Sequence, residues 1–381
     1  MILARLSLEN YRNLSNQKLI FSRQANIISG NNGEGKTNLL EAIFLLASTR
    51  SFRTLQIRDV IRWGTKGFRL EGEVEKQQGA YCLDIQQLES TKKLRINQKP
   101  RDIFDYVGHL NAHVFSSNQL ERFRSEAEQR RKFVDRGLYL LQPAHLRRMA
   151  EYTRVLKQKN SLLRDPSSIY NNEFGSLLGV WDQKIAELGA RIIASRSEYV
   201  EKVRHNLSSQ AGSLGPESVN IQYHPCNEIS SASDTYGVQS QLIKKINAHR
   251  EKEIRLKRSL VGPHRDGVSI FINGEEMQRF SSAGQQRGAL LACHLAQMDL
   301  HHSLHGEYPI FLIDDVDSEL DDERMNRVVE LLRRKTQIFM TTSRPDRICL
   351  GEYSHSAKWF HLEAGVVTEV DNSRIFNHRR G

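Results

Sequence analysis

The sequence predicts an α/β fold in which one domain is interrupted by a mainly helical lobe. Near the N-terminus a glycine-rich loop stands between an apolar strand and a helix, and farther on the apolar segment Ile310–Asp315 ends in two carboxylates. Between them, charged segments from Leu120 to about Arg258 carry apolar residues at three- and four-residue spacing, which indicates helices. We therefore expect residues 1–118 and 259–381 to form the α/β domain and residues 119–258 to form the lobe. No heptad repeat is sustained in the lobe, so we expect no long coiled coil.

The apolar pattern predicts the individual elements in order. Strands are expected over residues 2–8, 25–29, 68–74, 80–87, 112–115, 268–272, 309–314 and 337–341. Helices are expected over residues 38–47, 124–141, 145–163, 173–208, 282–304 and 322–334. Asn273-Gly274 suits the two-residue turn of a hairpin, and a final hairpin is expected over residues 358–370, broken at Ala364-Gly365. The polar segments 165–172 and 212–237 read as loops.

The composition describes a soluble globular chain that works in the cytoplasm. Of 381 residues, 39% are hydrophobic and 26% are charged, and the longest apolar runs fall far short of the ~18 residues that span a membrane. The N-terminus carries charge early and does not resemble a secretory signal. The four cysteines are scattered without a C-x-x-C pair, which fits a reducing compartment and disfavours a zinc site. The net charge of +10 favours a polyanionic partner, although a basic enzyme without one has the same charge.

The glycine-rich loop, GNNGEGKT at Gly30–Thr37, matches the phosphate-binding pattern G-x-x-x-x-G-K-[ST]. It follows an apolar strand and precedes a helix, so its backbone N–H groups and the positive helix end can cradle phosphates. An ordinary glycine-rich turn is the alternative, which the flanking strand and helix disfavour. We expect bound ATP to contact Gly30, Asn31, Asn32, Gly33, Glu34, Gly35, Lys36, Thr37 and Asn38. Lys36 would reach the β- and γ-phosphates, and the Thr37 hydroxyl would ligate Mg²⁺.

The two carboxylates that end the apolar segment Ile310–Asp315 predict the hydrolytic part of the site. Asp314 would hold Mg²⁺ opposite Thr37, and Asp315 would act as the general base on water. Solvated acids at a strand end are the alternative, which a phosphate loop in the same chain weakens. Many ATPases of this kind use Glu at the second position, and Asp is one methylene shorter, so we expect slow hydrolysis.

The segment SSAGQQR, Ser281–Arg287, resembles the signature motif of ATP-binding-cassette (ABC) ATPases. Taken alone it is only a polar helix start. In those ATPases the signature lies away from its own phosphate loop, so Ser282 and Gly284 would bind the nucleotide of a second subunit in a two-fold homodimer. Ser318–Asp321 resembles the D-loop of the same interface. Gln119 stands where a Q-loop residue would contact the metal and sense the γ-phosphate.

A wider set of motifs resembles the RecF family of bacterial recombination mediators, which is related to the heads of SMC and Rad50 proteins. The matching segments are LSLENYRNL (6–14), GNNGEGKTNLLEAI (30–43), FSSNQLERF (115–123), EQRRKFVD (128–135), GPHRDG (262–267), SSAGQQR (281–287) and IDDVDSELD (313–321). The resemblance implies an ABC-type ATPase fold with a short helical insertion and a slow, DNA-stimulated ATPase. It further implies that an ATP-bound homodimer engages double-stranded DNA near single-strand gaps and helps to load RecA with RecO and RecR, in replication, recombination and SOS repair.

Several other residues carry weaker expectations. Arg12, after the first strand, could touch a phosphate or could lie at a solvated turn. At the switch position after strand 337–341 the chain has Thr342 where cassette ATPases have His, so Thr342 is the candidate γ-phosphate sensor. Basic clusters that could contact duplex phosphates, or could simply be wet helix faces, are 130–132, 147–148, 244–245 and 250–258. His264 is expected to be structural or close to the nucleotide, and His301, His302 and His305 to lie at a helix end rather than in a metal site.

Two functions remain open at this stage. The first is an ATPase whose ATP-bound dimer clamps DNA and releases it after hydrolysis; the second is a nucleotide-gated binding and recruitment module in which hydrolysis is incidental. A small-molecule kinase leaves Ser282 unexplained, and a nuclease lacks an acidic metal cluster after the ATPase motifs.

Overall fold

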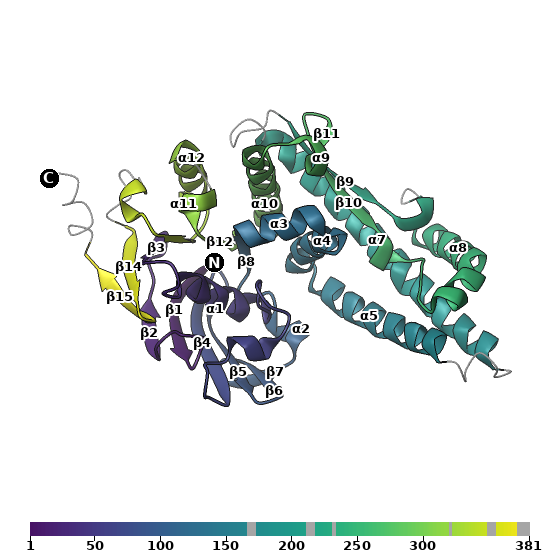
Figure 1. Ribbon diagram of the computed structural model, residues 1–381, viewed down its shortest axis with the longest axis horizontal. Helices are drawn as coiled ribbons and strands as arrows, with labels where there is room; N and C mark the ends of the chain where they lie inside the picture. Colours follow the sequence, from purple (N-terminus) through teal and green to yellow (C-terminus); the bar gives the residue numbers. More distant parts are fainter. Residues whose placement is uncertain (166–172, 211–217, 231–233, 320–321, 349–355, 372–381) are drawn as a thin grey trace. The chain divides into compact units, whose positions relative to one another are not determined.

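The structure is a computed structural model that describes residues 1–165, 173–210, 218–230, 234–319, 322–348 and 356–371. The chain divides into two compact units (Figure 1). Unit 1 contains Met1–Arg122 and Ser281–Gly381, and unit 2 contains Phe123–Ser209 and Ser218–Phe280. The second boundary therefore differs from the expected one, because residues 259–280 belong to unit 2. None of the helices in the described ranges is both long and apolar enough to cross a membrane.

The central sheet of unit 1 has the strand order β15-β14-β3-β13-β12-β8. Its strands are β3 (Ala25–Ser29), β8 (Ala112–Phe115), β12 (Ile310–Ile313), β13 (Ile338–Thr342), β14 (Lys358–Glu363) and β15 (Val366–Val370). All neighbours are parallel except β14 and β15, which form the expected antiparallel hairpin. Strands β3, β8, β12 and β13 are buried along their whole length, which explains their continuous apolar sequences. The carboxyl ends of these parallel strands meet at one edge, where polar residues follow each strand.

A second sheet of unit 1 is antiparallel and has the order β2-β1-β4-β5-β6-β7. Its strands are β1 (Ile2–Glu9), β2 (Gln17–Ile20), β4 (Gly67–Lys76), β5 (Gly79–Leu88), β6 (Thr91–Ile96) and β7 (Lys99–Arg101). Alternate residues of β4 are buried, as the alternating sequence predicts for a sheet with one covered face. Helix α1 (Lys36–Ser48) contacts strands of both sheets, and its buried side chains belong to the same core as the two sheets. This core fixes the helix that follows the glycine-rich loop.

The remaining helices of unit 1 are short except for two. They are α2 (Ile103–Tyr106), α3 (Ser117–Ser125, which runs across the boundary), α10 (Ala283–His305), α11 (Val316–Glu319) and α12 (Asp322–Arg333), with 3-10 turns η1 (Ile57–Val60) and η4 (Pro345–Arg347). Helix α10 begins one residue after Ser282, whose hydroxyl accepts a hydrogen bond from Gln285 N in a capping box. The expected helix start at 282 is thereby confirmed as a cap.

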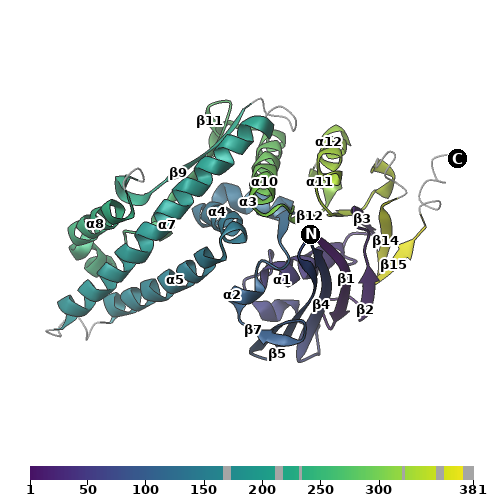
Figure 2. The ribbon, with the colours of Figure 1, turned by 180° about the vertical axis from the view of Figure 1, so that it is seen from behind.

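Unit 2 is mainly helical, and α5 runs alongside α7 in both views (Figures 1 and 2). Its helices are α4 (Ala127–Leu141), α5 (Pro143–Arg164), α7 (Phe174–Gln210), α8 (Thr235–Leu256) and α9 (Met277–Phe280), with 3-10 turns η2 (Cys226–Glu228) and η3 (Pro263–Arg265). A three-stranded antiparallel sheet joins β9 (Val219–His224), β10 (Gly267–Ile272) and β11 (Glu275–Glu276). The pairing of β10 with β9 and the contacts of α9 with β10 explain why residues 259–280 belong here. Strand β9 was wrongly expected to be part of a loop.

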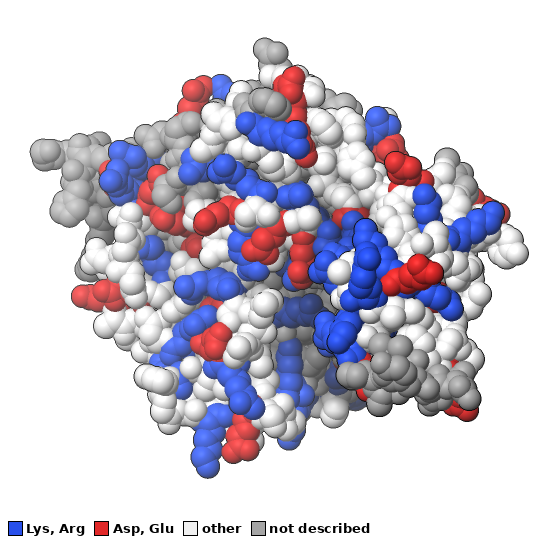
Figure 3. Space-filling view, turned by 45° about the vertical axis from the view of Figure 1, so that its right-hand side comes forward, with Lys and Arg blue, Asp and Glu red and all other residues white. Residues whose placement is uncertain are grey.

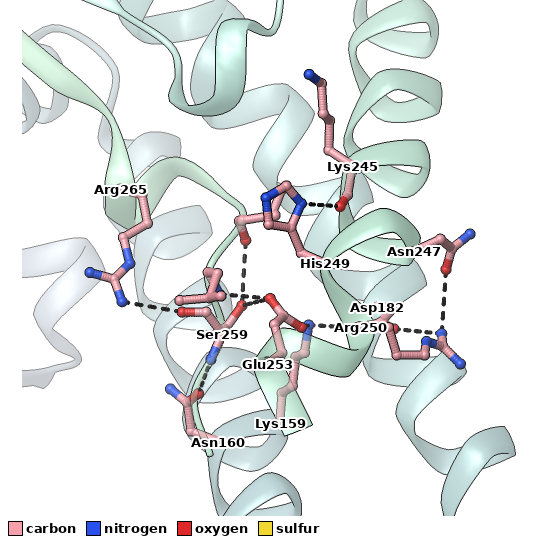
Figure 4. Close-up of polar contacts among 12 residues, drawn as sticks. Lys159, Asn160, Asp182, Lys245, Asn247, His249, Arg250, Glu253, Ser259 and Arg265 are labelled. Carbon is pink, nitrogen blue, oxygen red and sulfur yellow. Dashed lines mark hydrogen bonds and ion pairs between the residues drawn. The ribbon is translucent and has the colours of Figure 1, made fainter. Parts of the chain in front are cut away.

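A buried lysine lies at the centre of the three long helices of unit 2 (Figure 4). Lys159 of α5 is fully buried, and its ammonium lies 2.7 Å from Asp182 Oδ1 of α7 and 2.6 Å from Glu253 Oε2 of α8. Arg250 donates to the other oxygen of Asp182 at 2.8 Å, and Ser259 N–H is bonded to Asn160. Two positive and two negative charges thus offset one another, which buried charges require. The network ties α5, α7 and α8 together.

Candidate nucleotide-binding site

A cavity of about 230 Å³ lies at the carboxyl-end edge of the parallel sheet of unit 1. Its lining residues are Asn31, Asn32, Gly33, Gly35, Lys36, Thr37, Asn38, Arg53, Asp314, Asp315 and Thr341. Ligands of open α/β sheets bind in crevices of this kind, outside the carboxyl ends of the strands. The structure therefore brings the glycine-rich loop and the two carboxylates together, as the sequence predicts.

The glycine-rich loop has a backbone that needs glycine. Gly35 has φ 116°, and a Cβ there would lie 2.7 Å from Asn13 Oδ1, whereas a Cβ on Gly33 would meet no atom within 4 Å. The first N–H groups of α1 follow directly, and no side chain caps this helix end. Open backbone donors at a helix N-terminus form a ready anion site. The loop is thus shaped for a phosphate group.

Lys36 lies over this loop and is 7% exposed. Its ammonium donates to the carbonyl oxygens of Gly30 at 2.6 Å and Asn31 at 3.1 Å. Burial lowers the pKa of Lys36 from its usual value, because the charged form is poorly solvated there. The carboxylates of Asp315, Asp317 and Asp314 partly offset this effect, and a phosphate in the cavity would add further negative charge beside the ammonium.

Asp314 links three segments that are distant in the sequence. Its carboxylate accepts from the Thr37 hydroxyl at 2.9 and 3.0 Å and from the Thr341 hydroxyl at 2.8 Å. Burial raises the pKa of Asp314 above its usual value. Hard oxygen ligands of this kind suit Mg²⁺, and a nearby cation would also offset the cost of the buried carboxylate. Thr37 and Asp314 therefore fit the expected metal site.

Asp315 lines the same cavity in an unusual backbone conformation. Its φ is 53°, in the left-handed region that Asp tolerates better than most residues. The N–H of Asp315 donates to Thr341 Oγ1 at 2.7 Å. The strand end thus presents one carboxylate to Thr37 and the next to the cavity.

Other predicted site residues occupy different places. Glu34 accepts a hydrogen bond from the N–H of Ala364 at the tip of the β14–β15 hairpin. Arg12 forms a bidentate ion pair with Glu41, at 2.9 and 3.0 Å, and Gln119 has a buried Oε1 without a hydrogen-bond partner among the described residues. Ser282 caps α10. Among the described residues, the cavity lining includes none of Arg12, Gln119, Ser282 and Gly284.

Two lining residues were missed by the sequence reasoning. Arg53, in the segment after α1, donates to Asn38 Oδ1 at 2.6 Å and brings a positive charge to the cavity. Thr341 is the last residue but one of β13, the strand beside β12, and its hydroxyl donates to Asp314 and accepts from the N–H of Asp315. A hydroxyl at the carboxyl end of a buried parallel strand was the available signal for Thr341. No comparable signal marked Arg53 among the other basic residues of that segment.

The motif GPHRDG lies in unit 2, where its residues are structural. Asp266 is 1% exposed and accepts hydrogen bonds from Arg196, Tyr223 and the N–H of Cys226. Arg196 in turn forms a bidentate pair with Asp135 at 2.8 Å. This buried network accounts for the acidic end of the motif without a ligand.

The sheet, the phosphate loop and the paired carboxylates define the fold of an ABC-type P-loop ATPase domain. A family model described as RecF/RecN/SMC N terminal domain matches residues 2–359. The DNA replication and repair protein RecF of Geobacillus thermodenitrificans is 34% identical over 356 residues, which cover 91% of this chain and 94% of that protein. RecF of Enterococcus faecalis is 35% identical over 352 residues, which cover 91% and 94%. The chain belongs to the RecF family.

Solved structures agree with this assignment. The recombination mediator protein RecF-ATP in the RecFOR pathway superimposes with a TM-score of 0.88 at 28% identity, covering 97% of this chain and 98% of that chain. An SMC head bound to the C-winged helix domain of ScpA has a TM-score of 0.54 at 15% identity, covering 97% of both chains, and shares the fold.

Proposed function

We propose that the chain is a cytoplasmic ATPase of DNA replication and repair, whose ATP-bound homodimer engages double-stranded DNA near single-strand gaps. With RecO and RecR it would help to load RecA, and ATP hydrolysis, slow and stimulated by DNA, would release it. The observation that carries the proposal is the cavity in which Lys36, Thr37 and Asp314 converge, in a chain that superimposes on RecF-ATP.

The chain's own residues suggest how the site would work. The loop N–H groups and Lys36 would bind the phosphates of ATP, and Arg53 would add a second positive charge. Mg²⁺, held by Thr37 and Asp314, would neutralise charge on the phosphates. Asp315 would accept a proton from the attacking water, and Gln119 would help to position that water and the metal. The shorter reach of Asp supports a slow chemical step.

The signature residues support a dimer. Ser282 is exposed and begins α10, and neither Ser282 nor Gly284 belongs to the described lining of the chain's own cavity. A helix N-terminus of this kind would face the γ-phosphate bound by a second copy. ATP would then contribute contacts that disappear with the γ-phosphate, which makes it a switch.

Contacts to DNA would come from the exposed members of the basic clusters. Arg130 and Arg131 donate to the carbonyl oxygens of Val268 and Asp266, so these two arginines have structural partners. The exposed members are Arg147, Lys244, Lys252, Arg255, Lys257 and Arg258. Figure 3 shows lysine and arginine side chains gathered in a blue cluster right of centre on the face in view. Such contacts would be to phosphates, so affinity would fall with salt and depend little on sequence.

The test is the solution mass measured by light scattering with Mg-ATP, with Mg-ADP and without nucleotide. We expect a dimer with Mg-ATP alone, and a monomer in all three conditions for Ser282→Arg. Ser90→Arg, at an exposed turn of unit 1, adds the same charge elsewhere and should dimerise as the wild type does. A mass that does not respond to nucleotide would remove the switch mechanism.

A second experiment distinguishes the two candidate functions, a dimer that clamps DNA and a recruitment module in which hydrolysis is incidental. Asp315→Asn should bind ATP and dimerise but remain on duplex DNA, as followed by fluorescence anisotropy after ATP addition. If its repair activity in cells equals that of the wild type, hydrolysis is incidental and the recruitment module is the better description.

A further inference from the structure

We propose that Asp317 is a positioning residue of the hydrolytic site, which holds Asp315 by joining the turn after β12 to the loop after β13. The inference rests on the proposed ATPase function and deepens it. The Asp317 carboxylate accepts hydrogen bonds from the Thr342 hydroxyl at 2.7 and 2.9 Å. It also accepts from Ser343 N at 2.6 Å, Ser343 Oγ at 2.9 Å and Arg344 N at 3.2 Å.

Two adjacent threonines at the end of β13 contact both ends of the acidic turn, which is formed by residues 314–317. Thr341 donates to Asp314 and accepts from the N–H of Asp315, and Thr342 donates to Asp317. Both threonines are fully buried, and Val316, between the two held aspartates, is fully buried as well. The position of the four residues Asp314 to Asp317 therefore depends on the end of β13.

Asp315 needs such support because its backbone is in the left-handed region, with φ 53°. A non-glycine residue stays there only when its surroundings hold it. The N–H of Asp315 is bonded to Thr341, and two residues farther on Asp317 is bonded to three consecutive residues of the neighbouring loop. Without Asp317 one end of the strained turn would be released, and the carboxylate of Asp315 would lose its fixed position in the cavity.

The same contacts give the switch position a different role from the expected one. Thr342 was the candidate γ-phosphate sensor, but its hydroxyl is bonded to Asp317, and Thr342 does not belong to the described lining of the cavity. Thr342 would then act on the reaction through Asp317 and the backbone of the acidic turn rather than by direct contact.

The experiment compares steady-state hydrolysis and ATP binding for Asp317→Asn, Asp317→Ala and Thr342→Val. We expect kcat to fall on the order of 10²-fold for Asp317→Ala and Thr342→Val, because a misplaced base loses rate steeply. KM and the ATP dissociation constant should stay within about threefold, since the phosphate loop is untouched. The kcat of Asp317→Asn should lie between that of the wild type and that of Asp317→Ala. Its amide oxygen can still accept from Thr342, but its NH₂ group cannot accept from Ser343 and Arg344.

Three further variants test a merely structural explanation. Thr342→Ser keeps the hydroxyl and should retain most of kcat. The double variant Thr342→Val with Asp317→Ala should be no slower than Asp317→Ala alone, since that substitution already removes the bond to Thr342. Asp299→Asn, which alters a carboxylate bonded to Lys335 elsewhere in unit 1, should leave kcat and KM unchanged.

The outcomes separate this inference from the proposed function. Wild-type kcat for Thr342→Val and Asp317→Asn, with Asp315→Asn inactive, would overturn the role of Asp317 and leave the ATPase intact. A wild-type chain that binds ATP but hydrolyses none, with or without DNA, would instead remove the ATPase proposal on which it rests. If Asp317→Ala fails to fold, the nearly isosteric Thr342→Val still decides the matter.

Discussion

The hydroxyl of Thr37 lies 2.9 and 3.0 Å from the two carboxylate oxygens of Asp314. This contact joins the phosphate loop to the end of β12, and it places two oxygen ligands side by side at the cavity. Burial disfavours the charged form of Asp314 and so raises its pKa, an effect that a bound cation would offset. A cation held by this pair would therefore couple nucleotide affinity to the metal.

Asp314→Asn should remove the effect of Mg²⁺ on ATP binding. The wild type should bind a fluorescent ATP analogue on the order of 10–100-fold more tightly with Mg²⁺ than with EDTA, and the variant equally under both conditions. The melting temperature of the ligand-free variant should not fall, since Asn Oδ1 can accept from Thr37 and Thr341 without a buried charge. Asp315→Asn is the control and should keep the response to Mg²⁺. A magnesium response retained in Asp314→Asn would refute the metal assignment.

Arg12→Ala should destabilise unit 1 by removing the main cationic partner of the buried Glu41 carboxylate, which would keep only the Ser51 hydroxyl and the more distant Arg53 among the contacts described. Glu41 has no exposed surface, and Arg12 binds both of its oxygens. Breaking a buried pair of this kind costs about 3–5 kcal/mol of the free energy of unfolding, measurable by urea denaturation. Adding Glu41→Gln should recover part of that loss.

The double variant also tests whether Arg12 contacts a phosphate. If Arg12 serves only Glu41, the double variant should bind ATP as the wild type does. If stability recovers while ATP affinity stays at least tenfold weaker, Arg12 touches the nucleotide as well.

Much of the fold could be predicted because its elements have clear hydrophobic patterns and turn residues. The buried parallel strands are short continuous apolar runs, and the Asn273-Gly274 turn has the positive φ angles, 51° and 87°, of a two-residue hairpin. Strand β9 was not predicted because it is short and lies among Ser-rich polar residues. Only its pairing with β10 makes it a strand. The lobe boundary was misplaced for the same reason, since local sequence does not show which unit β10 pairs with.

The site could be predicted only where a loop motif or a strand end carries the chemistry. Lys36, Thr37, Asp314 and Asp315 follow from such patterns, and the structure brings them to one cavity. The ion pair of Arg12 with Glu41 and the bond of Thr342 to Asp317 depend on side chains from distant segments. Those pairings are set by packing, which one sequence does not display.

Gly365→Ala should weaken ATP binding although Gly365 does not belong to the described cavity lining. The hairpin tip contacts the phosphate loop through Ala364 N–H and Glu34, and a Cβ on Gly365 would lie 2.0 Å from the Asn13 carbonyl oxygen. Asn13 donates to the Glu34 carbonyl, so displacing the tip would disturb the loop from two directions. We expect several-fold weaker ATP binding and a loss of roughly 1–3 kcal/mol of stability.

Gly64→Ala is the matched control for that variant. Gly64 has the same φ of 80°, but a Cβ there would meet no atom within 4 Å. Gly64→Ala should lower the stability only by the cost of placing Ala at this positive φ, and it should leave ATP affinity unchanged. Equal effects of the two substitutions on ATP affinity would contradict a role for the hairpin tip.

His264 should make the stability of unit 2 depend on pH. Burial lowers the pKa of His264 to about 4. Its Nδ1 lies 2.7 Å from the Tyr152 hydroxyl, which fits a neutral ring that accepts at this nitrogen. The unfolded chain binds a proton near pH 6.5 and the folded chain only near pH 4, so the stabilising contribution is present above pH 6.5 and is lost as pH falls toward 4. The full effect is roughly 3 kcal/mol, at about 1.4 kcal/mol per pKa unit.

The measurement is the free energy of unfolding by urea from pH 7.5 to pH 4.5 for the wild type and His264→Gln. Gln can accept from Tyr152 but does not titrate, so the difference between the two curves should narrow steadily below pH 6.5. Gln222→Asn, at an exposed position of the same unit, changes no titratable group, and its curve should run parallel to that of the wild type. Parallel curves for His264→Gln would mean that the ring takes up its proton at the same pH in the folded and unfolded chain, which would contradict the lowered pKa.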